Sequence, residues 1–142
     1  MKTSLLDVNV LLALVWPNHR HHVAAHRWFD EVDDRHFATC SLTQLGFLRL
    51  SSNPSFTSEA VSPRDAIALL RKLSRTPEHE FWESPSADDP KIFQHARGHQ
   101  QVNDAWLIEV ARQNGGYLAT FDKPLALQDP SSQTVIVIDV LE

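Results

Sequence analysis

Short apolar runs alternate along the chain with longer segments of helical periodicity, and this alternation constrains the fold more than any other feature. The runs typical of strands are residues 4–8, 36–40, 80–83, 117–121 and 134–141. The segments that predict helices between them are residues 9–15, 22–33, 42–52, 64–74 and 102–113. Strands that alternate with helices indicate an α/β fold with a mainly parallel sheet.

Several residues predict where these elements begin and end. Ser41 and Ser62 are suited to cap helices, and Pro63 fits the first helical turn after Ser62. The pair Gly115-Gly116 is typical of a helix end. The last run, TVIVIDVL, is apolar almost throughout, so we expect that strand to be buried on both faces.

The length of 142 residues fits one domain with a sizeable core, and we therefore expect residues 1–142 to form a single domain. Cys40 is the only cysteine, which excludes a disulfide framework and a cluster of thiolate metal ligands. No apolar stretch approaches the roughly 18 residues that span a membrane, and the N-terminus lacks a signal-peptide pattern. We expect a reduced, cytoplasmic environment and no membrane association.

The chain is acidic, because 13 Lys and Arg residues stand against 18 Asp and Glu residues. Proteins that hold nucleic acid through bulk charge are basic. Any nucleic-acid role must therefore rest on a local basic patch or on metal ions. His95, Arg97 and His99 form one of the few such patches, and they could contact phosphate or simply face solvent.

Three aspartates occupy positions where a parallel sheet gathers its ligands. Asp7 lies near the end of the first strand among apolar neighbours, where an unpaired carboxylate is costly to bury. Asp122 directly follows the strand YLATF, and Asp104 begins the helix 102–113. Ligands collect outside the carboxyl ends of the strands in open parallel sheets. Carboxylates gathered without cysteine suit Mg²⁺ or Mn²⁺.

Each acid also has a purely structural interpretation. Asp104 could cap its helix or favour the helix dipole. Asp122, before Lys123-Pro124, could be a turn residue. Asp7 is the hardest to explain structurally, because unpaired acids are rarely buried.

Four segments, LLDVNVLLAL, HRHHVAAHRWF, VNDAWLIEVA and GGYLATFDKPL, occur in an order that resembles the PIN-domain ribonucleases. The resemblance covers essentially the whole chain and is greatest to VapC-type toxins of toxin–antitoxin pairs. It implies a three-layer α/β/α domain with a mainly parallel sheet of four to five strands. It also implies a toxic endoribonuclease that hydrolyses RNA phosphodiester bonds with Mg²⁺ or Mn²⁺, with a cognate antitoxin as its protein partner.

The resemblance also implies residue roles. Asp7, Asp104 and Asp122 would hold the metal, Asn9 would brace the site, and Thr120 would hydrogen-bond the acidic cluster. The family usually has a glutamate where this chain has Gln44. An amide oxygen can orient a water but carries no charge, so a single metal ion is expected, and reduced activity would be unsurprising.

Two further groups of residues suggest other roles. His22 and His26 are spaced to bind Zn²⁺ on one helix face. The whole group of four, with His19 and His21, is more simply explained as solvated histidines.

The helix that follows residue 41 is too apolar for a single buried face. Phe47, with Leu48 and Leu50, therefore suggests contact with a second copy or an antitoxin.

Two other functions remain open from the sequence. A phosphatase of the haloacid dehalogenase type would use an aspartate after strand one, but its DxD signature requires a second aspartate where Asn9 stands. A PIN-fold module that binds RNA or a partner without cutting is the other alternative, and Gln44 is the residue that favours it.

Overall fold

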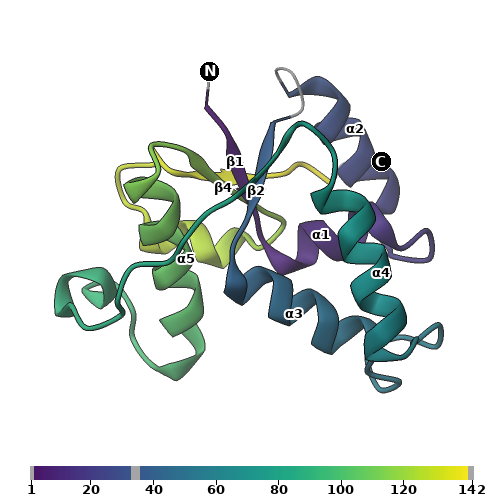
Figure 1. The fold of residues 1–142 in the computed structure, drawn as a ribbon. Helices are drawn as coiled ribbons and strands as arrows, with labels where there is room; N and C mark the ends of the chain where they lie inside the picture. The colour runs from purple at the N-terminus through teal and green to yellow at the C-terminus, as the bar shows by residue number, and fades with distance from the viewer. Residues whose placement is uncertain (1, 33–35, 141–142) are drawn as a thin grey trace.

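The computed structural model describes residues 2–32 and 36–140, and its centre is a five-stranded sheet (Figure 1). The strands are β1 (Ser4–Leu6), β2 (Phe37–Thr39), β3 (His79–Phe81), β4 (Tyr117–Thr120) and β5 (Val135–Val137). Their order is β3-β2-β1-β4-β5, and every neighbouring pair is parallel. The predicted α/β fold with a parallel sheet is confirmed.

Within residues 2–32 and 36–140, five α-helices and three short 3-10 helices connect the strands. The α-helices are α1 (Val8–Val15), α2 (His22–Glu31), α3 (Ser41–Ser51), α4 (Pro63–Ser74) and α5 (Val102–Gln113). The 3-10 helices are η2 (Pro90–Phe93), η3 (His99–Gln101) and η4 (Lys123–Gln128). The predicted helix 22–33 ends at Glu31, and Asp33 lies outside the described residues. None of these helices is both long and apolar enough to cross a lipid bilayer.

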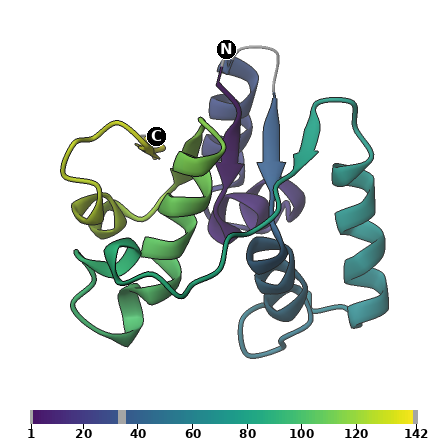
Figure 2. The same cartoon turned by 60° about the vertical axis from the view of Figure 1, so that its left-hand side comes forward.

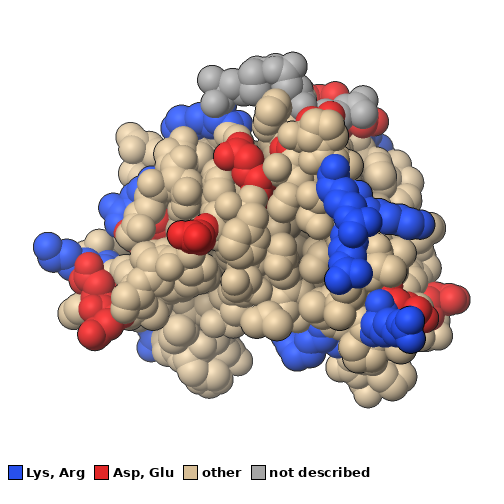
Figure 3. Space-filling model, in the orientation of Figure 1, with Lys and Arg blue, Asp and Glu red and all other residues tan. Residues whose placement is uncertain are grey.

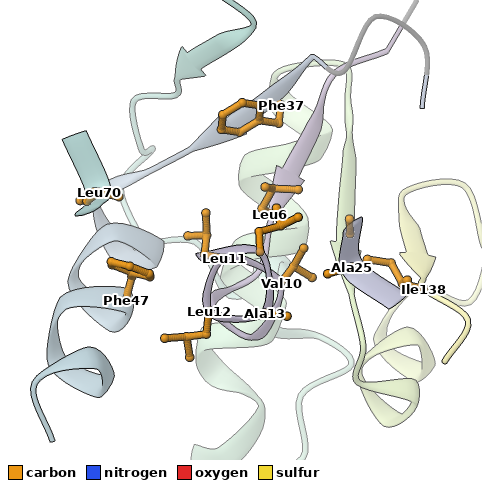
Figure 4. Packing of buried hydrophobic residues seen from close by; sticks show 12 residues of the cluster. Leu6, Val10, Leu11, Leu12, Ala13, Ala25, Phe37, Phe47, Leu70 and Ile138 are labelled. Atoms are coloured by element: carbon orange, nitrogen blue, oxygen red, sulfur yellow. The ribbon is translucent and has the colours of Figure 1, made fainter. Parts of the chain in front are cut away.

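The helices cover both faces of the sheet, which gives the three expected layers (Figure 2). Leu6 and Phe37 project from the strands into one core, where Leu11 of α1 and Phe47 of α3 meet them (Figure 4). Neighbouring strand residues point to the opposite face, as the period of two requires. There they pack against Leu107, Val110 and Ala111 of α5.

The end of α5 is held close to the sheet by a glycine pair. Gly115 has a positive φ of 67°, the left-handed conformation that commonly ends a helix. Gly116 lies so close to the Thr3 carbonyl and the Trp82 ring that no side chain could fit there. This close approach sets where α5 lies against β4.

Several sequence predictions about element ends were wrong. The first strand stops at Leu6 because the Asp7 carboxylate caps α1. Cys40, and not Ser41, is the N-cap of α3, while Ser62 does cap α4. The final strand is limited to Val135–Val137 and is only half-buried, because β5 lies at the sheet edge and not in its centre.

The expected contact surface on α3 also requires a correction. Phe47 is fully buried in the core, and Leu48 and Leu50 pack against the same core. The helix is apolar because it is packed between α1 and α4, with which it shares extensive contacts. Leu45 is the large apolar side chain of α3 that is exposed, at 63%.

Candidate metal centre

Asp7 lies at the junction of β1 and α1, where the chain leaves the carboxyl end of the central strand. Its Oδ1 accepts a hydrogen bond from the Val8 N–H at 2.7 Å, which caps the helix. Its Oδ2 accepts one from the Thr120 hydroxyl at 2.7 Å. Burial raises the pKa of Asp7, and the Asp122 charge adds to this rise, while these two hydrogen bonds oppose it. Asp7 is therefore a half-buried carboxyl that two hydrogen bonds hold in one orientation.

The Thr120 hydroxyl is the common partner of the groups around Asp7. In addition to donating to Asp7, its oxygen accepts from the Asp122 N–H at 3.1 Å and from Asn9 Nδ2 at 3.4 Å. The Asn9 Oδ1 in turn accepts from the Phe121 N–H at 3.4 Å. The structure thus brings Asp7, Asn9, Thr120 and Asp122 together at the ends of β1 and β4.

Asp104 is the third carboxylate near this point. Gln101, and not Asp104, occupies the N-cap position of α5, so Asp104 does not serve as the helix cap. Burial, followed by the charges of Asp7 and Asp122, raises the pKa of Asp104 to about 6. Asp104 shares one pocket with Asp7 and a second pocket, of about 660 Å³, with Asp122. It therefore lies between the other two acids, within reach of their charges.

The three carboxylates fit a hard divalent cation. Within residues 2–32 and 36–140, no three His, Cys, Asp or Glu side chains are close enough to form a complete metal cage. Mg²⁺, however, usually keeps several waters and binds through one or two carboxylates. Each Asp7 oxygen also keeps a free lone pair beyond its one hydrogen bond. A cation would relieve the repulsion that raises the pKa of Asp104.

Gln44 is not brought to this group. Its Nε2 donates to the Thr39 hydroxyl oxygen at 3.1 Å, and that oxygen also lies 2.7 Å from His79 Nε2. Gln44 lines neither of the pockets that contain Asp104. Glu109 does not replace it, because its carboxylate binds Arg112 and Gln113 and lines a different pocket.

The histidines that suggested a zinc site have structural partners. His22 Nδ1 lies 2.7 Å from the Ala13 carbonyl oxygen, and His26 Nε2 lies 2.8 Å from that of Leu14. These carbonyls are in the last turn of α1, where helical partners are lacking. The two histidines therefore fasten α2 to the end of α1.

The basic patch before α5 is divided by the structure. His95 and Arg97 line the pocket that holds Asp104 and Asp122, whereas His99 does not. On the other side of Asp104, Arg49 lines the pocket that holds Asp7. Sequence reasoning did not identify Arg49 as a site residue, because only the packing of α3 against α1 brings it there.

Comparison with known proteins places the chain in a family. The PIN domain model matches residues 4–128. Ribonuclease VapC39 of Mycobacterium tuberculosis is 42% identical over 131 residues, which are 87% of this chain and 91% of the relative. Ribonuclease VapC44 of the same organism is 41% identical over 127 residues, with 87% and 89% covered.

A solved structure has the same fold. VapC20 of Mycobacterium tuberculosis, a toxin that cleaves the sarcin–ricin loop, superposes with a TM-score of 0.67. The superposition covers 96% of this chain and all of VapC20 at 14% sequence identity. Together with the relatives at about 40% identity, the matches establish that this chain belongs to the PIN-domain family and, within it, to the VapC ribonucleases.

Proposed function

We propose that this protein is a metal-dependent endoribonuclease, the toxic component of a cytoplasmic toxin–antitoxin pair. The observation that carries the proposal is the convergence of three acids: the Asp7 carboxylate and the Asp122 N–H share the Thr120 hydroxyl, and Asp104 lines a pocket with each of these two acids. Among residues 2–32 and 36–140, no Lys, Arg or His side chain is hydrogen-bonded to Asp7, so an ion from solution is the natural partner of this charge.

The chain's own residues would prepare the site. Thr120 fixes one Asp7 oxygen, and Asn9 holds Thr120 and the Phe121 N–H in place. Mg²⁺ or Mn²⁺ at these acids supplies positive charge to the phosphoryl oxygens and lowers the pKa of an attacking water. Asp104 would hold a cation in its ionised form, so metal binding would displace the proton from a carboxyl whose pKa is about 6 in the metal-free protein.

RNA is the substrate that we propose, on the strength of the ribonuclease relatives. The chain's net charge of −5 argues against binding through bulk charge. His95 and Arg97 on one side of Asp104, and Arg49 on the other, supply local donors for phosphate oxygens.

The protein partners follow from the family and from one exposed side chain. We propose a cognate antitoxin and a homodimer, with Leu45 in the contact because it is 63% exposed beside the Asp7 pocket. Light scattering after size exclusion should show a dimer that Leu45→Asp dissociates. A monomer at micromolar concentration, unchanged by Leu45→Asp, would exclude the dimer.

The nuclease proposal is tested by replacing one acid. Asp7→Asn keeps the side-chain volume but removes the charge, so it should abolish RNA cleavage and growth inhibition. Asp65→Asn, on the exposed surface of α4, is the matched control and should leave both unchanged. Full cleavage by wild type in EDTA, or by Asp7→Asn, would exclude the mechanism.

A second function is a PIN-fold module that binds RNA without cutting it. Position 44 favours this module, because it holds a glutamine in place of the family's usual glutamate. The Gln44 amide is hydrogen-bonded to Thr39, so it adds no ligand to the three acids. Calorimetry with Mn²⁺ separates the two. Mn²⁺ binding that Asp104→Asn weakens supports the nuclease, and no binding supports the module.

A further inference from the structure

A pocket apart from the acids lies between two connections, residues 16–21 that join α1 to α2 and residues 52–62 that join α3 to α4. Its volume is about 410 Å³, within the range typical of ligand sites. Asn18 Nδ2 donates to the Thr57 hydroxyl oxygen at 3.3 Å, and this bond links the two connections. The pocket shares no wall residue with the two pockets that hold the acids. A ligand here would therefore be bound independently of the metal.

Aromatic and basic side chains make up most of the wall of this pocket. They are Trp16, His19, Arg20 and Phe56. Glu59 follows the last wall residue along the chain but does not line the pocket, and neither does any other carboxylate of residues 2–32 and 36–140. A nucleotide combines a flat aromatic base with an anionic phosphate, and proteins bind it with aromatic rings and basic side chains. The wall therefore matches the chemistry of a nucleotide.

Phe56 presents an exposed ring from a backbone that is already fixed. Its exposed fraction is 47%, and it belongs to neither hydrophobic core. The Phe56 N–H donates to the Asn53 carbonyl oxygen at 2.9 Å, and the Ser55 N–H donates to Asn53 Oδ1 at 2.9 Å. Because the ring is positioned before a ligand arrives, binding to it costs less conformational entropy.

Arg20 and His19 supply donors to the pocket. Arg20 is exposed, and no carboxylate among the described residues forms an ion pair with it. Burial lowers the pKa of His19, and the nearby charges of His21 and Arg20 add to this effect, so the His19 ring is neutral at neutral pH. His19 Nδ1 accepts the His21 N–H at 3.0 Å, which leaves the ring proton on Nε2 as a donor.

A row of rings connects this pocket to the proposed metal site. The centre of the His19 ring lies 5.8 Å from that of His21, and the His21 ring stacks on Phe121 at 4.8 Å with 30° between the ring planes. Phe121 directly precedes Asp122, and its N–H donates to Asn9 Oδ1. All three rings of the row are partly exposed. An RNA strand that lies over them would reach from the acids to the pocket.

We propose that this pocket binds an unpaired base of the RNA substrate away from the scissile phosphate, with Phe56 stacked on the base and Arg20 bound to its phosphate. The inference rests on the proposed ribonuclease function and adds to it a second contact with the RNA strand. A duplex keeps its bases stacked inside the helix, so the pocket favours unpaired RNA. The contact also lets a chain with a net charge of −5 hold RNA through local groups.

The test is an NMR titration of the isotope-labelled full chain with short unpaired RNA oligonucleotides of random sequence, in EDTA so that nothing is cut. The indole N–H of Trp16, identified by its loss in Trp16→Phe, and the amide of Phe56 should shift and saturate. An RNA duplex, nucleoside monophosphates and inorganic phosphate should each bind more weakly. A monophosphate that binds as tightly as the oligonucleotides would assign the pocket to free nucleotides and overturn the proposal.

Two variants report on the proposed contacts. Phe56→Ala should weaken oligonucleotide binding about tenfold, the usual effect of losing one stacked base, and should melt as wild type does because Phe56 lies outside both cores. Phe56→Trp keeps a ring and should bind at least as tightly as wild type. Arg20→Ala should weaken binding and reduce its dependence on salt, because one phosphate contact is lost.

Matched controls lie elsewhere on the surface. Phe81→Ala removes a similarly exposed ring, at 49%, from the edge strand β3. Arg71→Ala removes a charge from α4, over which Lys and Arg side chains gather in Figure 3. Both should bind RNA as wild type does. Equal weakening by Arg71→Ala would mean binding by bulk charge and would overturn the proposal, as would unchanged binding by both Phe56→Ala and Arg20→Ala. Shifts at Phe56 that grow with protein concentration alone would assign the surface to a protein contact and refute it.

The proposed function and this inference fail in distinguishable ways. In cleavage of a long RNA, Phe56→Ala should raise KM about tenfold while kcat changes little, because the lost contact is separate from the reacting groups. If Asp7→Asn abolishes cleavage while Phe56→Ala leaves RNA binding and KM unchanged, the nuclease stands and the pocket is refuted. If Asp7→Asn still cleaves, the metal mechanism fails, and the titration in EDTA still decides the pocket.

Discussion

The Thr120 hydroxyl donates a 2.7 Å hydrogen bond to Asp7 Oδ2, across 113 residues of sequence. The bond forms because β1 and β4 are parallel neighbours in which Leu6 pairs with Ala119. Both strands therefore end at the same level of the sheet. A one-residue slip in this register would turn Thr120 to the opposite face. The geometry of the acids therefore depends on the pairing of these two strands.

Thr120→Val should damage both stability and activity. Valine has the shape of threonine but leaves Asp7 Oδ2, Asn9 Nδ2 and the Asp122 N–H without their shared partner. We expect the free energy of unfolding to fall by about 1–3 kcal/mol and RNA cleavage to fall by at least about tenfold. Urea unfolding and a cleavage assay measure the two effects. Thr120→Ser keeps the hydroxyl and should cleave nearly as wild type, whereas equal loss in both variants would contradict the assigned role.

The metal-free protein should lose stability as the pH rises through about 6. Asp104 has a folded-state pKa of about 6, above the ordinary aspartate value of 3.8, and the pKa of Asp7 is raised in the same direction. Because the pKa is raised, the folded state binds the Asp104 proton more tightly than the unfolded state does. Protonation of Asp104 therefore stabilises the fold fully below pH 3.8, and this stabilisation is lost above about pH 6.

Thermal unfolding in EDTA across this pH range measures the effect. Asp104→Asn should flatten the profile and be more stable than wild type above pH 6. The lowered pKa values of His19 and His79 act in the opposite direction, but they are common to both proteins and cancel in the difference. Mn²⁺ should restore wild-type stability above pH 6 and have little effect on Asp104→Asn. Parallel pH profiles for the two proteins would contradict the prediction.

His26→Ala should destabilise the fold without affecting metal binding. The His26 ring lies 2.8 Å from the Leu14 carbonyl oxygen, and its removal leaves this helix-end carbonyl unpaired. We expect a loss of about 0.5–1.5 kcal/mol in the free energy of unfolding, measured by urea titration against the exposed-site variant His99→Ala. Zn²⁺ should not raise the melting temperature of wild type. A zinc-dependent rise that His26→Ala removes would restore the metal interpretation of these histidines.

Gln44→Glu should not improve the enzyme. The Gln44 amide donates to the Thr39 hydroxyl oxygen, and a glutamate carboxylate at neutral pH has no proton to donate there. We expect the free energy of unfolding to fall by roughly 1 kcal/mol, with Mn²⁺ affinity unchanged by calorimetry. An increase in Mn²⁺ affinity of tenfold or more would show that position 44 reaches the acids after all.

The fold was largely predictable because it depends on periodicity. The helix at 102–113 was predicted with its observed bounds, and the parallel sheet followed from the alternation of elements. The burial of Val135–Val137 was not predictable in this way. An apolar run has the same composition at a sheet edge as at its centre, and only the strand order distinguishes the two.

The site was predictable to the extent that it lies at strand ends. Asp7 follows β1 directly and Asp122 lies two residues beyond the end of β4, so the pairing of these parallel strands brings the two acids together. The position of Gln44 away from the acids was not predictable. It depends on a hydrogen bond from the Gln44 amide to the Thr39 hydroxyl, which joins the end of a strand to the first turn of the next helix. Phe56 gave no sequence signal, since only the fold brings its loop beside the connection between α1 and α2.

Strand β1 lies at the centre of the sheet, between strands that are synthesised later than it is. Strand β1, which Asp7 follows, is synthesised well before its neighbour β4, which begins at Tyr117. A nascent chain that stops earlier contains Asp7 and Asp104 but lacks Thr120, Asp122 and the strand that aligns them. The proposed metal site therefore cannot assemble before residues 117–122 have been synthesised, because only then are Thr120 and Asp122 present beside Asp7.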